Sequence, residues 1–444
     1  MINIKYLFLL FFLLIIVSQD LYISFSLALF IVILIRFFTI SNNGLVFREF
    51  VLLLYVINYL LSPSISFLLG EKITAYNLKL SPQAYFNLAI PGIVFFYLGL
   101  FSINTNLFSP NFSAVNIAAI INEELLKKVT ILAILSSLLT SFLPGDLAFV
   151  VYLISLLQYV SAFSLFALNP KKNKVWPAIT LLFVLYKSFL VGMYHDAVMW
   201  VLFFGIIFIY IIKPTLKVKL IGTFFVVVVV LFIQSIKQSY REEVWYGGKQ
   251  ASLATVSGVG YSKASADIIL GEENLLGSLT RSNQAWIFSS TVDNMDRNKD
   301  FQGLTVVYKY IEASLLPRFL APDKIKSGDK EIFNTFSGHT INAGTSMGLG
   351  IFADGYIAYG AIGVYIFGFA LGLIFALTFK LLEGWTKISP FYVLLIFPLL
   401  NYAVRPDCEL QTTINHLSKG IMLYGLIVWY TKKRFSFTIE NSAQ

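Results

Sequence analysis

The sequence predicts an all-α polytopic membrane protein with about twelve transmembrane helices and one long loop outside the membrane. Hydrophobic residues make up 57% of the 444 residues, and only 13% are charged. The apolar residues recur in runs of roughly 15 to 22, the length that a helix needs to cross a bilayer core. One stretch, 237–355, breaks this pattern and separates two groups of apolar runs.

The candidate spans follow one another closely along the chain. They lie at 4–18, 21–40, 49–69, 87–104, 129–143, 147–168, 175–194, 197–213, 218–236, 356–380, 389–404 and 415–431. The first run lacks an A-x-A-like cleavage site and a second span follows at once, so we expect a retained helix rather than a signal peptide. The chain thus divides into N-terminal membrane helices (1–236), a large external loop region (237–355) and C-terminal membrane helices with a tail (356–444).

Basic residues between the spans predict the orientation of the chain. The groups "KKNK" (171–174), "KPTLKVK" (213–219) and "KKR" (432–434) fall in alternate loops. Because loops rich in Lys and Arg stay in the cytoplasm, we expect both termini there and 237–355 on the opposite, periplasmic side. The net charge of +9 therefore reflects topology, and we expect no nucleic-acid partner.

The composition also argues against several kinds of chemistry. Cys408 is the single cysteine, which excludes a disulfide framework within one chain. No Cys/His cluster has the spacing of metal ligands. We therefore expect neither a metal nor another cofactor.

A rigid basic motif lies within the external region. The segment "LPRFLAPDK" (316–324) places Arg318 between two prolines and is closed by Lys324. Proline fixes the backbone, and the planar guanidinium suits phosphate oxygens, so the segment is a candidate pyrophosphate site. The alternative is an arginine that snorkels at the membrane interface.

A second arginine, Arg281, occurs in "SLTRSNQAWIF". If the segment is helical, Arg281 and Gln284 share one face. Two arginines on the same outer region make a two-point clamp on an anion geometrically feasible. A surface cation in a solvated loop is the alternative.

Lys187 lies deep in the seventh predicted span, in "VLYKSFLVGMYHD". A continuous helix would place Tyr194 and His195 on the same side as Lys187. Ionisable residues within a membrane span are functional candidates by default, although a lysine can also snorkel to the interface. His195 with Asp196 is a weaker candidate for a base and its orienting carboxylate, because adjacent side chains on a helix do not face each other.

The tenth span opens with "GIFADGYIAYGAIGVYIFGFALG" (350–372). Asp354 is the acid nearest the outer mouth, where a base for a hydroxyl would be needed, but it is also placed as a helix N-cap. Gly368 and Gly372 indicate close helix packing. His339 and Arg405 add polar groups to the same outer face.

These outer-face motifs resemble the Wzy-type oligosaccharide repeat unit polymerases. In that family an arginine begins the long external region, a "Pro-Arg... Pro-x-Lys-Pro" element lies within it, and a "Glu-x-Tyr-x-x-Phe-Gly" element starts the next membrane helix. The resemblance covers roughly residues 275–375. It departs from the family pattern at Asp354, which replaces Glu, at Tyr359, which replaces Phe, and in "DKIK", which lacks the second proline.

The resemblance implies a metal-independent glycosyltransferase of GT-C-like architecture in the bacterial inner membrane. It would polymerise undecaprenyl-pyrophosphate-linked oligosaccharide repeat units into O-antigen or exopolysaccharide on the periplasmic side. Membrane lipid, a Wzz-like chain-length regulator and a Wzx-like flippase would be its partners. We expect the catalytic residues to be Asp354, Arg318 and Arg281, and the substrate-binding residues to be Lys324, Lys187, Tyr356, Arg405, His195 and His339.

Three other functions fit the same features. An O-antigen ligase uses the same donor and also has a long external loop. A lipid-linked oligosaccharide flippase or transporter fits the number of helices, but no repeat of two halves is visible. A non-catalytic assembly protein would tolerate alanine at the arginines.

Overall fold

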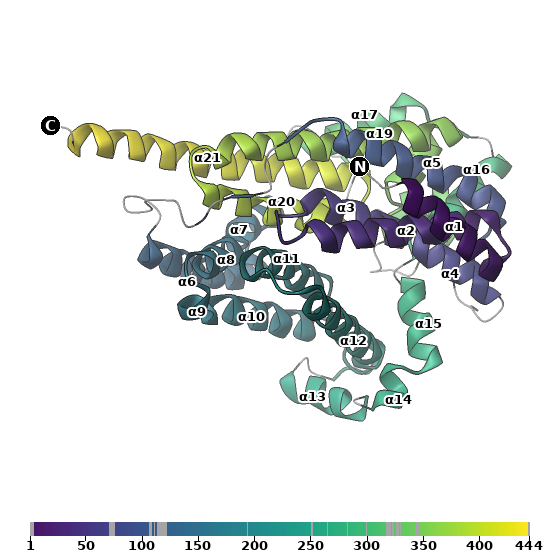
Figure 1. Ribbon diagram of the computed structural model, residues 1–444, viewed down its shortest axis with the longest axis horizontal. Helices are drawn as coiled ribbons and strands as arrows, with labels where there is room; N and C mark the ends of the chain where they lie inside the picture. Colours follow the sequence, from purple (N-terminus) through teal and green to yellow (C-terminus); the bar gives the residue numbers. More distant parts are fainter. Residues whose placement is uncertain are drawn as a thin grey trace.

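The protein is described here by a computed structural model (Figure 1). The described residues are 4–70, 76–105, 109–110, 112, 122–192, 194–249, 252–263, 265–281, 283–298, 300–316, 321, 324–325, 328, 330–341 and 347–442. Over these residues all regular structure is helical and no strand occurs. The all-α prediction is therefore confirmed for the described part of the chain.

Each of the predicted apolar segments is helical. They correspond to α1 (Ile4–Ser18), α2 (Leu21–Ile40), α3 (Phe47–Val56) continuing through η1 (Ile57–Leu61) into α4 (Ser62–Leu69), α5 (Pro82–Phe101), α6 (Glu123–Leu139), α7 (Gly145–Ser155) with α8 (Leu157–Leu168), α10 (Val175–Val191), α11 (His195–Ile212), α12 (Leu216–Arg241), α19 (Ile351–Thr386), η5 (Pro390–Leu395) with α20 (Ile396–Ala403), and α21 (Leu410–Ser442). Within the described residues, eight helical segments are long and apolar enough to cross a membrane. The protein is thus a helical protein with multiple candidate membrane spans.

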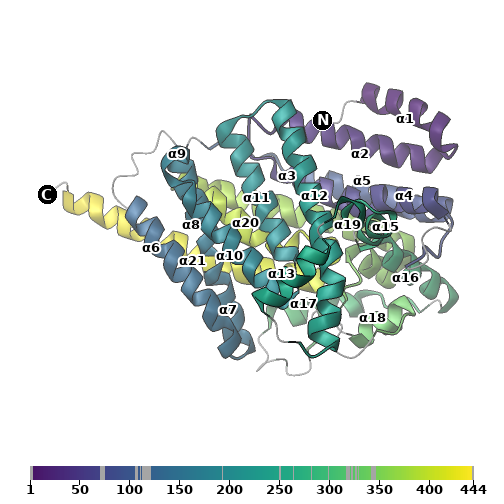
Figure 2. The ribbon, with the colours of Figure 1, turned by 90° about the horizontal axis from the view of Figure 1, so that it is seen from below.

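Helices α5 and α19 pack along each other (Figures 1 and 2). Glycines allow their backbones to meet: a Cβ on Gly99 would lie 2.2 Å from the Phe369 carbonyl oxygen, and one on Gly372 would lie 2.3 Å from that of Phe96. Gly368 likewise faces the Gly92 carbonyl. The predicted role of Gly368 and Gly372 in close packing is confirmed.

Helix α19 contains a sharp break near its start. Tyr359 and Gly360 have non-helical backbone angles, and Gly360 adopts φ 62° and ψ −144°. The segments on either side meet where a Cβ on Gly363 would lie 1.8 Å from the Gly355 carbonyl oxygen. Residues 351–358 therefore form a short, buried helical arm that carries Asp354 and Tyr356.

The region 237–355 divides into two groups of helices. The first group leans on α12 at the edge of the molecule (Figure 1) and comprises η4 (Glu242–Tyr246), α13 (Leu253–Ser262), α14 (Ala266–Ile269) and α15 (Glu272–Arg281). The second group packs on one end of the bundle and comprises α16 (Ala285–Asn298), α17 (Leu304–Leu315) and α18 (Lys330–Ser337). The buried aromatic residues of α16, Trp286 and Phe288, join it to the main hydrophobic core.

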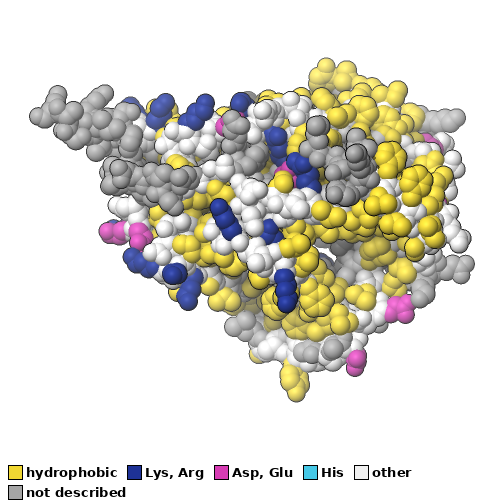
Figure 3. All heavy atoms as spheres, in the orientation of Figure 1, with side chains coloured by type: hydrophobic (Ala, Val, Ile, Leu, Met, Phe, Trp, Pro, Cys, Tyr) yellow, Lys and Arg dark blue, Asp and Glu magenta, His cyan; other side chains and the backbone are white. Residues whose placement is uncertain are grey.

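Contacts between loops define two ends of the bundle. At one end Asn42 donates to the Pro214 carbonyl oxygen, and Lys172 in α9 (Pro170–Asn173) pairs with Glu123 at 3.0 Å. At the other end Arg241 donates to the Gly192 carbonyl oxygen. The predicted basic loops thus gather at one end, and Figure 3 shows Lys and Arg side chains over the half of this face that carries α6, α9 and α21. We call the end with Asn42, Pro214 and Lys172 the basic end. We call the opposite end, where α16 lies, the polar end.

Candidate functional site

The carboxylate of Asp354 lies fully buried at the polar end, between three helices. Tyr310 of α17 donates its hydroxyl to Oδ1 at 2.9 Å, and the backbone N–H of Leu410 donates to Oδ2 at 2.8 Å. Leu410 is the first residue of α21, so the carboxylate accepts from a helix N-terminus, where negative charge is favoured. Burial and the nearby Asp354 charge raise the pKa of Tyr310 well above its usual value, which keeps this phenol a donor. Asp354 therefore connects α17, α19 and α21, with no exposed surface toward a substrate.

Tyr356, two residues after Asp354, lies on a different side of the helix and contacts α16. Its hydroxyl donates to Asp296 Oδ1 at 2.5 Å, and its ring contacts that of Phe301. The residue is only 7% exposed, whereas Asp296 is exposed. Tyr356 thus fixes the short arm of α19 against the helix that covers it.

Residues 404–409 form a polar turn between α20 and α21. Arg405 donates to both carboxylate oxygens of Asp407, from Nε at 3.0 Å and from an Nη at 2.5 Å. Burial lowers the pKa of Arg405, but Asp407 outweighs this and raises the pKa above its usual value. Burial conversely raises the pKa of Asp407, and Arg405 outweighs it and lowers this pKa. Both side chains are therefore charged at neutral pH. The two hydrogen bonds to Asp407 engage only some of the five N–H groups of the Arg405 guanidinium.

The N-terminus of α11 lies beside this turn. The His195 ring makes a hydrogen bond with the backbone of Asn401 and lies in the field of both Arg405 and Asp407. Its Nε2 is buried and has no hydrogen-bond partner among the described residues. Because a ring nitrogen that donates to a carbonyl leaves the other with a lone pair, Nε2 is placed to accept a proton.

Asp196 and Asn401 complete this cluster from two helices. Asn401 is fully buried, donates from Nδ2 to the Tyr152 hydroxyl at 3.0 Å, and forms a side-chain hydrogen bond with Asp196. The positive charges of Arg405 and Lys187 both act on the Asp196 carboxylate. Lys187 itself donates to the Ser137 carbonyl oxygen at 3.2 Å. We call His195, Asp196, Asn401, Arg405 and Asp407 the ionisable cluster.

The structure corrects two local predictions. The seventh span ends at Val191, where Gly192 adopts a left-handed C-cap with φ 71°, so Lys187 and His195 lie on different helices rather than on one face. Likewise α15 ends at Arg281, and Gln284 precedes α16, so these two residues do not share a helix face. In both cases a helix ends between the two residues, and the spacing of apolar residues in the sequence does not indicate this end.

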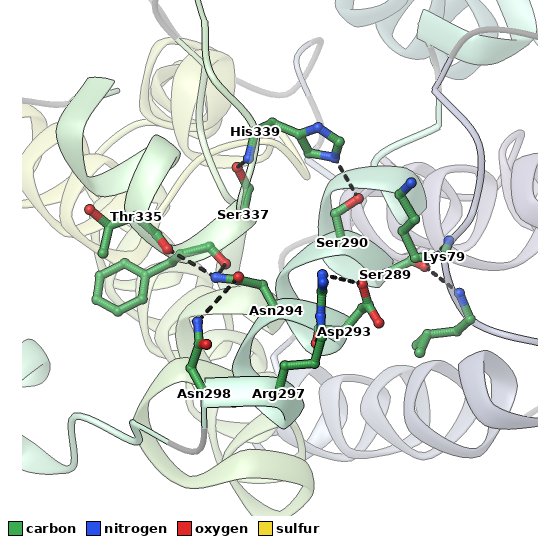
Figure 4. A network of polar contacts seen from close by, with 12 residues as sticks. Lys79, Ser289, Ser290, Asp293, Asn294, Arg297, Asn298, Thr335, Ser337 and His339 are labelled. Carbon is green, nitrogen blue, oxygen red and sulfur yellow. Dashed lines mark hydrogen bonds and ion pairs between the residues drawn. The ribbon is translucent and has the colours of Figure 1, made fainter.

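The remaining predicted site residues are not brought into the ionisable cluster by described contacts. Arg318 lies outside the described residues, and Arg281 is placed only by its backbone at the end of α15. Lys324 donates from Nζ to the Leu316 carbonyl oxygen at 2.6 Å and so caps the end of α17. His339 lies at α16, where its Nε2 is 2.9 Å from the Ser290 hydroxyl (Figure 4).

Sequence reasoning missed two residues that hold this end together, Tyr310 and Asn401. Tyr310 belongs to a buried stripe of α17 with Val306, Ala313 and Ser314, a helical spacing that is visible in the sequence. Asn401 follows an apolar run and shows no such signal. Over the described residues, no group of three or more His, Cys, Asp or Glu side chains is arranged to hold a metal ion.

Comparison with known proteins adds the family but no activity. A family model described as a domain of unknown function, DUF8712, matches residues 76–386. This match is well over half of the chain and runs from the segment before α5 to the end of α19. No curated protein and no solved structure matches the sequence. The chain is a member of the DUF8712 family of unknown function.

Proposed function

We propose that the protein is a membrane glycosyltransferase that polymerises undecaprenyl-pyrophosphate-linked oligosaccharide repeat units on the periplasmic side of a bacterial inner membrane. The observation that carries the proposal is the ionisable cluster, which lies at the polar end next to the long region 237–355, with Arg405 and Asp407 partly exposed. Ionisable groups inside apolar membrane helices are costly, pair with one another, and mark substrate or ion sites. The finer architecture that we propose has about twelve spans, a GT-C-like arrangement and cytoplasmic termini.

The cluster offers the groups that this transfer needs. The acceptor hydroxyl attacks the anomeric carbon of the lipid-linked donor, the new C–O bond forms, and the bond to the pyrophosphate oxygen breaks. His195 Nε2 is the nitrogen placed to take the hydroxyl proton. The N–H groups of Arg405 that Asp407 leaves unused are suited to the charge that develops on the departing pyrophosphate.

The buried Nε2 of His195 supports this assignment on energetic grounds. A buried polar atom without a partner costs roughly 1–3 kcal/mol, so such atoms are normally satisfied. An acceptor hydroxyl would satisfy it after the side chains that enclose this atom move apart, because Nε2 has no exposed surface in this structure. Asp354, whose two oxygens are already occupied, is assigned a positioning role instead of the role of base.

The test is the length of the surface polysaccharide on a gel, in a deletion strain complemented with wild type or variants. We expect the deletion to leave single repeat units on the lipid core, wild type to restore the ladder, and His195→Ala and Arg405→Ala to fail at equal membrane levels. Lys128→Ala, which removes an exposed cation at the basic end, serves as the matched control and should restore it.

Other outcomes distinguish the alternatives. Long chains that remain on the carrier lipid in the deletion strain would indicate an O-antigen ligase. Repeat units trapped in the cytoplasmic leaflet would indicate a flippase. A full ladder with His195→Ala and Arg405→Ala would remove the catalytic assignment of the cluster.

A further inference from the structure

One face of α16 carries polar side chains although most of the helix is buried. Asp293, Asn294 and Arg297 recur at helical spacing and reach the surface (Figure 4), whereas Ser290, one turn earlier, is buried at 2% exposure. Asp293 and Arg297 form an i,i+4 ion pair at 2.7 Å. The face is therefore polar but locally balanced in charge.

Two segments flank this face and are fixed to the helix by hydrogen bonds. On one side Ser289 Oγ accepts from the backbone N–H groups of Lys79 and Leu80 at 2.7 and 3.0 Å. On the other side Asn294 Nδ2 donates to the carbonyl oxygens of Thr335 and Phe336 at 2.9 and 3.0 Å. The backbone around the face is thus held in place before any ligand arrives.

An aromatic ring is held out at the edge of this face. Tyr76 has φ 61°, a left-handed conformation that is uncommon for a bulky residue, and remains 51% exposed. Its ring centroid is 4.6 Å from that of Trp286, which in turn is 5.4 Å from that of His339. Backbone strain of this kind concentrates at functional positions, and here it presents a supported ring to solvent.

His339 completes the face as a neutral hydrogen-bonding group. Burial and the positive charge of Lys79 lower the pKa of His339 below its usual value. The ring is then uncharged at neutral pH, with one nitrogen a donor and the other an acceptor. The Ser290 hydroxyl engages only Nε2.

We propose that Tyr76, His339 and Asp293, which we call the α16 face, bind a neutral sugar residue of the glycan, with the buried Ser290 hydroxyl holding the His339 ring in place. An aromatic ring suits the C–H face of a pyranose, and the imidazole and carboxylate supply the mixed donors and acceptors that sugar hydroxyls need. Asp293 neutralises Arg297 and opposes an anionic headgroup on α16 itself, so that Lys79 is the remaining cation that acts on His339. The identity of the sugar as part of the growing polymer rests on the proposed function.

Binding is measured by saturation-transfer NMR on the full-length protein in nanodiscs. The probe is the oligosaccharide released by mild acid from the surface polysaccharide of cells that carry the protein. We expect saturation of sugar ring protons with wild type and Tyr76→Phe, and binding about 2- to 12-fold weaker with Tyr76→Ala, the range that corresponds to one aromatic contact. Tyr261→Ala, which removes a ring that is 89% exposed on α13, should bind as wild type does.

The possible results separate this inference from the proposed function. Binding that is absent in wild type, or equal in wild type and Tyr76→Ala, overturns the α16 face. A third result is also informative. If Tyr76→Ala weakens sugar binding but deletion of the protein leaves polysaccharide length unchanged, the α16 face is supported and the proposed polymerase function is rejected. Melting temperatures of the variants show whether each one is folded. Tyr76→Phe is a second control, since it keeps the ring and removes only the hydroxyl.

Discussion

At the scale of single residues, Asp354 has the clearest structural role. One carboxylate satisfies a buried phenol and the first N–H group of α21. In Asp354→Asn, one of these donors faces an amide NH₂ instead of an oxygen. We expect a loss of about 1–3 kcal/mol in the free energy of unfolding, the cost of an unsatisfied buried donor, measured by denaturation in detergent.

Tyr310→Phe is the matched control for that substitution. It removes the donor to Oδ1 and leaves the bond from Leu410, so we expect a smaller loss, on the order of 1 kcal/mol. Equal stability of wild type and Asp354→Asn would show that the carboxylate is not the link between α17, α19 and α21.

The lowered pKa of His339 predicts a pH dependence of stability. An exposed histidine in the unfolded chain has a pKa of about 6.5. Because the pKa of His339 is lower than this in the folded protein, the unfolded chain binds the proton more readily, and protonation favours unfolding. The stabilisation is fully present above about pH 6.5 and is lost as the pH falls toward the lowered pKa of the folded state. We expect the melting temperature of wild type to fall more between about pH 7.5 and 5.5 than that of His339→Gln; parallel curves would contradict this.

The sequence was a partial guide to single residues. It identified His195 and Arg405 as polar groups on the outer side, and described contacts place both in the ionisable cluster. It did not identify Asn401, because an amide after an apolar run has no periodic partner in the sequence. Contacts between distant segments are made only by folding, and hydropathy does not encode them.

At the scale of helices, the apolar pattern located every predicted segment, but it did not locate the polar turns that extend them. The span 21–40 coincides with α2. Helix α6 begins at Glu123 rather than near 129, because Asn122 caps a charged first turn that remains helical. Hydropathy thus finds the apolar part of a helix, and capping decides where the helix starts.

The break in α19 is the element for which a substitution is most informative. Gly360 has φ 62° and ψ −144°, a conformation essentially restricted to glycine. We expect Gly360→Ala to lower the free energy of unfolding by about 1–3 kcal/mol, measured as a shift in the denaturation curve.

Gly384→Ala lies in the same helix and provides the control. Gly384 has no neighbour within 4 Å of an added Cβ, so alanine should be neutral or stabilise by up to about 1 kcal/mol. If Gly360→Ala were as stable as Gly384→Ala, the left-handed angle would not be required by the break.

At the scale of the whole molecule, the two ends differ in kind. The basic end gathers the loops that carry lysines, and the polar end gathers α16, α17 and the ionisable cluster. The proposed function needs the polar end in the periplasm, and the distribution of positive charge agrees with that orientation. The orientation is therefore a condition that the proposed function must meet, and single cysteines can test it.

Cys408 is buried and is the single native cysteine, so a Cys408→Ser background with one new cysteine reports the side on which it lies. Lys249→Cys after α12 and Lys172→Cys at the basic end replace side chains that are 61% and 62% exposed. In spheroplasts, we expect a membrane-impermeant maleimide to label Lys249→Cys at once and Lys172→Cys only after permeabilisation. The reverse pattern would place the ionisable cluster on the cytoplasmic side, away from lipid-linked substrate that has already been flipped across the membrane. Both the proposed polymerase function and the alternative ligase function would then be rejected.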